Sequence, residues 1–351
     1  MKTLFESYTD ILKENSKWNP TRNLNIEYVL PNVLKSLNSY NFIFEILFYD
    51  GNTRSLALDF SRYSELIPKE RYSHTVSLYL LGIQVAEAIG FKQFDLPIWD
   101  NCSQRNFLHH WATTCLYHDI AYCIEQSNDE FIPVNNQTLD IISDNLGLQY
   151  NLSSKDTIGI IERYYQYRIT AAKPTIDHGI IGAMMLYDSL LKRNNKMEKI
   201  AETAIIVCDK PMYGEENKAN ILKYALDIAR HNMWFAFNTD DIEKYESLGL
   251  NNLIARSDGS HKISFKKEPM LFLLCLIDTI DPIKAYSKKE PETVIRAVCL
   301  SSERVKDELK IVFDDCFDDK MKKKAQGCDT WLNVSVRTHE ASRCSICFDI
   351  K

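Results

Sequence analysis

The sequence predicts an all-α fold with a small C-terminal β-hairpin, and three features of the chain support this prediction. Between positions 71 and 290 most apolar residues recur three or four residues apart, which is the spacing of a buried helix face. Helix-ending signals such as Gly90 interrupt these patterns. Alternation of apolar and polar residues, which is typical of strands, marks the chain after about Thr330.

The helical patterns follow one another through the middle of the chain. The first pattern stops at Gly90, a residue suited to a C-terminal cap, and a Ser-x-Asp start signal opens another pattern near Ser153 or Ser154. The predicted core helices cover residues 73–89, 104–126, 154–169, 177–192, 217–235 and 268–281.

The two ends of the chain differ from this helical middle region. Residues 1–70 form a predicted N-terminal extension that packs on the core; it opens with an acidic amphipathic helix and continues with apolar segments of ambiguous type. The pattern of apolar and polar residues over 291–351 predicts a C-terminal amphipathic helix and then the β-hairpin. The division is therefore an extension over 1–70, a helical domain over 71–290 and a C-terminal region over 291–351.

Composition narrows the classes of function. The formal net charge of −6 argues against broad electrostatic binding to nucleic acid, because that mode of binding needs a basic face. The 10 cysteines are scattered rather than spaced as a framework, as expected of reduced thiols. No apolar stretch has the length of a membrane span and the N-terminus does not resemble a signal peptide, so we expect a cytoplasmic location.

A pair of neighbouring polar residues predicts a metal site. His118 and Asp119 stand among apolar residues in CLYHDIAYCI, where a carboxylate is costly to bury unless a cation or hydrogen-bond donors compensate its charge. On neighbouring helix positions an imidazole and a carboxylate can approach one ion from adjacent directions. A single His on a helix is more often a hydrogen-bonded structural residue, so the prediction depends on the other histidines and aspartates.

Four further side chains complete a pattern of known type. They are His74 in the first core helix, His178 in IDHGIIGAMML, His231 in LDIARHNMWF and Asp278 in FLLCLIDTID. With His118 and Asp119, their order resembles the HD-domain superfamily of metal-dependent phosphohydrolases, over about residues 71–286. The small residues Gly182 and Ala183 after His178, and Asp281 one turn after Asp278, resemble the same family. The resemblance implies an HD-type helical core.

The resemblance also implies a centre with two divalent ions, Fe, Mn or Zn. One ion would take His74, His118, Asp119 and Asp278, and the second would share Asp119 and take His178 and His231. Such ions would bind phosphoryl oxygens and lower the pKa of a bridging water toward neutrality, which would make that water the nucleophile. His118 and Asp119 would then be the catalytic pair.

One position departs from the family pattern. Many phosphohydrolase branches carry a Lys three residues after the Asp, where this chain has Tyr122. Arg168 or Lys173 would then hold the phosphate, with Tyr122 and His110 as further expected substrate contacts, or the substrate is not a phosphate at all.

The function expected from the sequence is hydrolysis of a phosphomonoester or phosphodiester in a nucleotide-like metabolite. Two alternatives stay open. A di-iron oxygenase of the HD-like type has a similar set of six ligands and needs no phosphate-binding lysine, and a catalytically silent nucleotide-binding module is the third interpretation. The expected partner is a small-molecule phosphate ester, with no nucleic-acid or membrane partner, and self-association into a homo-oligomer is left open.

Overall fold

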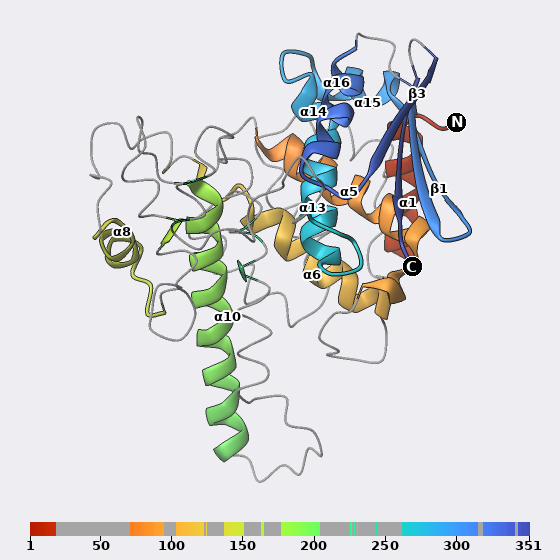
Figure 1. The fold of residues 1–351 in the computed structure, drawn as a ribbon. Coiled ribbons are helices and arrows are strands. Elements are labelled where there is room, and N and C mark those ends of the chain that lie inside the picture. The colour runs from red at the N-terminus through yellow and green to blue at the C-terminus, as the bar shows by residue number, and fades with distance from the viewer. Residues whose placement is uncertain are drawn as a thin grey trace. The chain divides into compact units, whose positions relative to one another are not determined.

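The structure is a computed structural model that describes most, though not all, of the chain (Figure 1). The described ranges are 1–18, 71–94, 103–122, 137–150, 177–203, 262–314, 319–340 and 343–351, with positions 124, 163–164, 225–226, 228, 230, 243 and 247. Of this part 64% is helical, and a small antiparallel sheet lies at the C-terminal end. No helix within the described ranges is both long enough and apolar enough to cross a membrane.

The described elements form two units, each treated by itself. The first unit contains α6 as far as Cys115 and all elements before α6 and after residue 255; the second begins at Leu116 and contains α8 and α10. The helices are α1 (Leu4–Trp18), α5 (Arg71–Ile89), η2 (Phe91–Gln93), α6 (Ser103–Tyr117), α8 (Thr138–Leu146), α10 (His178–Thr203), α13 (Pro269–Ile280), α14 (Pro282–Ala285), α15 (Pro291–Ala297), α16 (Lys320–Gly327) and η5 (Cys328–Thr330). The strands are β1 (Cys299–Val305), β2 (Glu308–Asp314), β3 (Ser335–Glu340) and β4 (Arg343–Asp349).

Helices α5 and α13 form the core of the first unit. Both are apolar on nearly every side and almost completely buried, which is typical of a central helix rather than a surface helix. The two helices pack against each other. Both predicted helices are thus confirmed: α5 ends just before Gly90, whose φ of 96° is a conformation that glycine adopts readily, and α13 begins at Pro269, a favoured first helical residue.

Helix α6 is tied to α5 by one side chain of its own. The indole Nε1 of Trp111 donates a hydrogen bond to the backbone oxygen of Tyr79 at 2.9 Å, and Trp111 is completely buried. The helix predicted over residues 104–126 ends earlier, at Tyr117, and the His118–Asp119 pair lies in the bend that follows. The expectation that this pair sits inside a helix is therefore wrong.

The N-terminal helix α1 belongs to the first unit. It contacts α5 and α15, and the backbone nitrogen of Leu4 donates to the oxygen of Val298 at 2.9 Å. The guanidinium of Arg296 lies 3.6 Å from the centre of the Phe5 ring. Residues 19–70, with the two apolar segments of ambiguous type, lie outside the described ranges.

A four-stranded antiparallel sheet follows α15, in the order β1-β2-β4-β3 (Figure 1). The predicted hairpin after about Thr330 is present as β3 and β4, paired through Val336 and Ile346. The helix predicted after position 291 covers only α15, because residues 299–314 form a second hairpin. In β2 the residues Leu309, Ile311 and Phe313 are buried and alternate with more exposed ones, so this strand has one face on the core. The described part of the core is helical, as predicted, and the C-terminal region contains two β-hairpins where the sequence predicted one.

Helix α16 lies close to the end of α13. It packs against α13, α14, β3 and β4. Its sequence KMKKKAQG buries Met321 and Ala325 and leaves the four lysines half-buried or exposed. This arrangement places a strongly basic helix beside the short α14.

The second unit contains the long helix α10, which confirms the helix predicted from His178. The buried carboxylate of Asp188 on α10 accepts hydrogen bonds from the backbone nitrogens of Gln149 and Tyr150, just after α8, at 2.7 and 3.0 Å. The predicted helices over 154–169 and 217–235 fall almost wholly outside the described residues.

Candidate metal centre

His74 and Asp278 face each other from the two central helices of the first unit. His74 belongs to the first turn of α5 and Asp278 to the last turn of α13. The His74 Nε2 atom lies 3.0 Å from Oδ1 of Asp278, and both side chains are buried. A buried carboxylate needs a positive partner or hydrogen-bond donors, so this pair is a suitable place for a cation.

A second carboxylate, Asp281, lies behind His74. Its Oδ2 atom is 2.7 Å from Nδ1 of His74 and accepts a 3.0 Å hydrogen bond from the backbone nitrogen of Lys284, so Asp281 also caps α14. Because an ionised carboxylate only accepts hydrogen bonds, Nδ1 of His74 carries the proton. In the neutral imidazole the Nε2 lone pair then points toward Asp278, which is the orientation that a metal ligand requires.

The hydrogen bonds continue from Asp281 to the N-terminal helix. Ser77 donates from Oγ to Oδ1 of Asp281 at 2.5 Å, and its single hydroxyl proton is thereby used. The Tyr8 hydroxyl, 2.8 Å from the same Oγ, is therefore the donor in that pair. Burial and the charge of Asp281 raise the pKa of Tyr8 well above its usual value, which keeps this donor protonated. The chain Tyr8–Ser77–Asp281–His74 is fully buried.

The two carboxylates determine the charge of His74 in the metal-free protein. Burial alone would lower the pKa of this imidazole, but hydrogen bonds to Asp278 and Asp281 and their negative charges raise it to about 9. Without an ion, a protonated His74 therefore lies between the two aspartates. A bound cation would take over the positive charge that this proton supplies.

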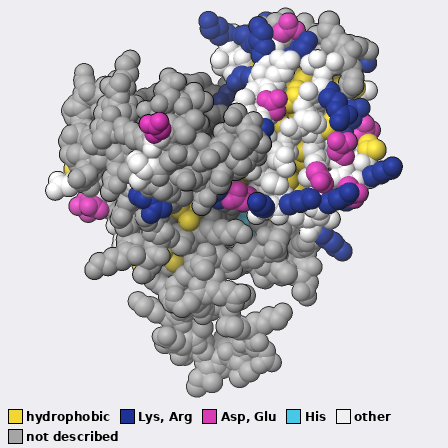
Figure 2. Space-filling view, in the orientation of Figure 1, with side chains coloured by type: hydrophobic (Ala, Val, Ile, Leu, Met, Phe, Trp, Pro, Cys, Tyr) yellow, Lys and Arg dark blue, Asp and Glu magenta, His cyan; other side chains and the backbone are white. Residues whose placement is uncertain are grey.

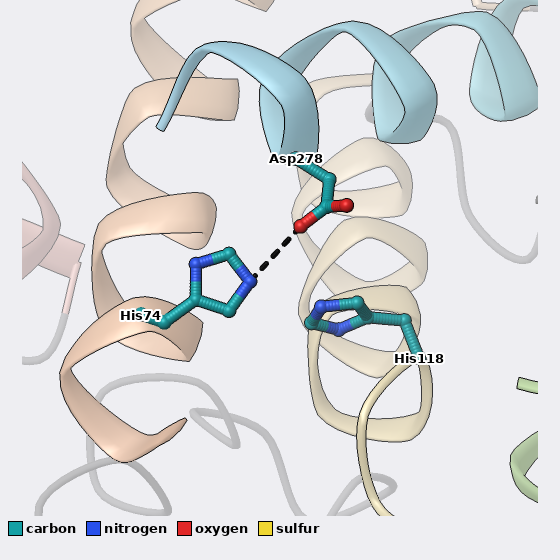
Figure 3. A group of neighbouring side chains, drawn as sticks. All are labelled: His74, His118 and Asp278. Atoms are coloured by element: carbon teal, nitrogen blue, oxygen red, sulfur yellow. Dashed lines mark ion pairs between the residues drawn. The ribbon is translucent and has the colours of Figure 1, made fainter. Parts of the chain in front are cut away.

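His118 completes a group of three buried side chains with possible ligand atoms. One such atom from each of His74, His118 and Asp278 lies within 4.8 Å of the others. Figure 3 shows the two imidazoles and the carboxylate turned toward one another, with His74 and Asp278 on helices and His118 at the end of a third helix. Because α6 is continuous up to Tyr117, His118 directly follows a helix that is held on α5 through Trp111.

In the second unit Asp119 lies close to two histidines. Its Oδ1 atom is 3.1 Å from Nε2 of His178, the first residue of α10, and its Oδ2 atom is 3.6 Å from Nε2 of His118. The His178 ring also meets the ring of Tyr122 edge-on, with centroids 4.9 Å apart. Asp119 therefore pairs with His178 and is not a member of the group of three.

A glycine permits the close approach of α10 to the end of α6. A Cβ atom added to Gly182 would lie 2.1 Å from the backbone oxygen of Tyr117, a contact that real side chains do not make. The expectation that this small residue allows close helix packing is confirmed. The approach positions the start of α10, with His178, beside the bend that carries Asp119.

The donor set suits a divalent transition metal. Imidazole nitrogen and carboxylate oxygen are the preferred ligands of Fe, Mn and Zn ions. Ligand atoms about 2.1 Å from one ion lie roughly 3 to 4 Å apart, which falls within the 4.8 Å that encloses the ligand atoms of the group of three. The orientation of His74 by Asp281 is a second observation in favour, because metal-binding histidines usually donate their other N–H to a carboxylate.

The other residues expected at the site are described only in part. His110 lies buried in α6, and Tyr122 lies beside His178. His231, Lys173 and Arg168 lie outside the described residues, so their assignment as ligand or substrate contacts stays a prediction. The sequence interpretation did not assign roles to Ser77 and Tyr8, because no spacing rule links these residues to one another or to Asp281, and it assigned none to Lys284. Asp281 was noted only for its place one turn after Asp278; the segment Asp281-Pro282 is also typical of a helix start.

Comparison with protein-family models, curated proteins and solved structures finds no match for this chain.

Proposed function

We propose that this protein is a metal-dependent hydrolase of phosphate esters, built on an HD-type helical core. The observation that carries the proposal is the buried group of His74, His118 and Asp278, with ligand atoms within 4.8 Å of one another. The same three residues, in the same order along the chain, belong to the pattern that resembles the HD-domain superfamily. The substrate class we propose is a phosphomonoester or phosphodiester of a nucleotide-like metabolite.

Each described residue has a stated role in this proposal. His74, His118 and Asp278 hold the ion, while Asp281 fixes the proton of His74 on Nδ1. A divalent ion in this place would bind phosphoryl oxygens and lower the pKa of a water molecule, which then attacks phosphorus. Asp119 lies between His118 and His178, where its carboxylate can serve as a ligand of a second ion.

A second ion is part of the proposal. His178 and Asp119 supply two of its ligands, and their 3.1 Å approach brings an imidazole nitrogen and a carboxylate oxygen together. His231 is the third proposed ligand. A cytoplasmic location also stays a prediction.

The decisive experiment is elemental analysis of the purified protein, combined with a phosphatase and phosphodiesterase panel in the presence of Mn or Fe. We expect about two equivalents of metal per chain and hydrolysis of at least one phosphate ester. His74→Ala and Asp278→Asn should abolish both. Asp140→Asn, an exposed aspartate on α8, is the matched control and should change neither.

Other outcomes would replace the proposal. Metal near zero, even after reconstitution, would mean that the histidines and aspartates have a structural role only. Bound iron together with oxygen-dependent turnover and no phosphatase activity would identify an oxygenase of the HD-like type.

A further inference from the structure

A lysine occupies the open side of the candidate metal ligand Asp278. The Lys284 Nζ atom lies 2.6 Å from Oδ1 and 2.5 Å from Oδ2 of Asp278, so the ammonium contacts both carboxylate oxygens. The Lys284 side chain is 31% exposed, whereas that of Asp278 is 2% exposed. The Lys284 side chain thus connects a partly exposed position to the buried carboxylate.

A second lysine approaches from helix α16. The half-buried Lys324 belongs to this helix, which packs against both α13 and α14. Burial and the nearby charge of Lys284 lower the pKa of the Lys324 ammonium, while Asp278 and Asp281 act in the opposite direction. Lys324 thus lies on a helix that packs against the two helices carrying Asp278 and Lys284.

The surroundings of these lysines are basic as well. Figure 2 shows Lys and Arg side chains gathered at the top of the view, where Figure 1 labels α16. The ammonium of Lys320, also on α16, lies 5.7 Å from the ring centre of the buried Tyr286. A chain with a net charge of −6 therefore has a local concentration of positive charge next to its metal site.

Metal binding to Asp278 would neutralise the negative charge that now pairs with the Lys284 ammonium. His74 contacts both Asp278 and Asp281, and the Lys284 ammonium contacts both carboxylate oxygens of Asp278. A divalent ion on Asp278 would supply two positive charges of its own and would repel the neighbouring ammonium. Lys284 would then turn from Asp278 toward another anion, and Lys324 adds a second positive charge. A phosphate dianion carries the matching charge.

We propose that Lys284, together with Lys324, forms the subsite that binds the phosphate group of the substrate next to the metal centre. This proposal rests on the proposed function. Each lysine donates N–H hydrogen bonds to phosphate oxygens, and no covalent bond forms.

The test is calorimetric titration of the Mn-loaded protein with inorganic phosphate, with Mn content measured in the same samples. For Lys284→Gln we expect phosphate to bind roughly tenfold to a hundredfold more weakly, since a charge-assisted hydrogen bond is lost. Lys324→Gln should weaken binding several-fold, and Lys284→Arg should keep it within a few-fold of the original value. Lys288→Gln, an exposed lysine four residues further on, is the control and should change nothing.

Titration of Mn into the phosphate-free proteins supplies a second readout. Because Lys284 competes with the ion for Asp278, Lys284→Gln should bind Mn more tightly than the original protein. A loss of Mn in this variant would show that Lys284 is a structural counterion and would overturn the subsite. Normal Mn binding with unchanged phosphate affinity in both glutamine variants would also overturn it, while leaving the proposed function intact. Absence of Mn binding in the original protein would overturn the proposed function and the subsite with it.

Discussion

The Nδ1 atom of His74 lies 2.7 Å from Oδ2 of Asp281, although the two residues are 207 positions apart in the chain. This contact determines which imidazole nitrogen carries the proton and therefore which nitrogen can bind an ion. Asp281 is thus a positioning residue for the proposed ligand His74. The roles of the two aspartates differ accordingly: Asp278 faces the ion, and Asp281 supports the histidine.

The substitution Asp281→Asn tests this division of roles. Oδ2 of Asp281 accepts from both His74 Nδ1 and the Lys284 backbone nitrogen, so the single oxygen of the new amide keeps the most hydrogen bonds in that place, with the amide nitrogen toward Ser77. This oxygen is uncharged and holds the Nδ1 proton of His74 less strongly, which makes Nε2 a weaker ligand for an ion. We expect metal affinity to fall roughly tenfold to a hundredfold, as measured by competition with a chelator.

Asp319→Asn, which alters an exposed carboxylate at the start of α16, serves as the control for this substitution. If Asp281→Asn bound metal as tightly as the original protein, Asp281 would be only the cap of α14 and the positioning role would be wrong.

The buried hydrogen bonds from Tyr8 to Ser77 and on to Asp281 predict that α1 and α5 are energetically coupled. Tyr8→Phe removes one donor and should cost about 1 kcal/mol of stability. Ser77→Ala removes a donor to Asp281 and an acceptor for Tyr8, and should cost about 1 to 3 kcal/mol. In the double variant the loss should be smaller than the sum, as measured by denaturant unfolding in a double-mutant cycle. Strictly additive losses would mean that the three groups do not act as one chain.

The position of Gly182 has no room for a side chain, so a substitution there should lower both stability and metal binding. In Gly182→Ala the new methyl group would collide with the backbone oxygen of Tyr117, and α10 would have to move. We expect a loss of about 1 to 3 kcal/mol and a lower midpoint of thermal unfolding. Since His178 begins α10, the variant should also bind less metal. Gly327→Ala, where nothing lies within 4 Å of the added methyl group, should leave both measurements unchanged.

The central helices could be predicted from the sequence because each is specified locally. Helix α5 has a continuous apolar pattern and ends at Gly90, and α13 begins with a proline and consists almost entirely of apolar residues. The order of His74 and Asp278 within these helices, taken with the resemblance, indicated one common site. The contribution of Asp281 to the orientation of His74 could not be predicted, because it depends on how α5, α13 and α14 pack against one another.

The end of α6 illustrates why helix boundaries are harder to predict. Apolar spacing continues past Tyr117, and no Gly or Pro interrupts it, so the sequence favours a helix through Asp119. The helix nevertheless stops at Tyr117, whose carbonyl is in close contact with Gly182 of α10. The bend that contains His118 and Asp119 thus begins where α10, a segment far away in the sequence, packs against the end of α6.

The hairpin of β1 and β2 was missed because its turn lacks the usual residues. Val305 pairs with Glu308, so Lys306 and Asp307 alone form the loop. Two-residue loops normally carry Asn-Gly, Asp-Gly or Gly-Gly, and none of these is present. The charged residues of this segment also suit a solvent-exposed helix, and the sequence therefore predicted a helix here.

The same turn predicts a stabilising substitution. Lys306 has a φ of 58°, a left-handed conformation that costs an ordinary L-residue about 1 kcal/mol. Asn tolerates this conformation better. Two hydrogen bonds hold the turn: the Arg304 side chain donates to the backbone oxygen of Lys306, and the backbone nitrogen of Ile350 donates to the backbone oxygen of Asp307. Neither hydrogen bond uses the Lys306 side chain. Lys306→Asn should therefore raise stability by about 0.5 kcal/mol, and Lys306→Val should lower it by about 1 to 2 kcal/mol.

Thermal unfolding of both variants, with Lys267→Asn in another exposed turn as the control for charge, measures the difference. Equal stability of the Asn and Val variants would contradict the left-handed conformation at this position.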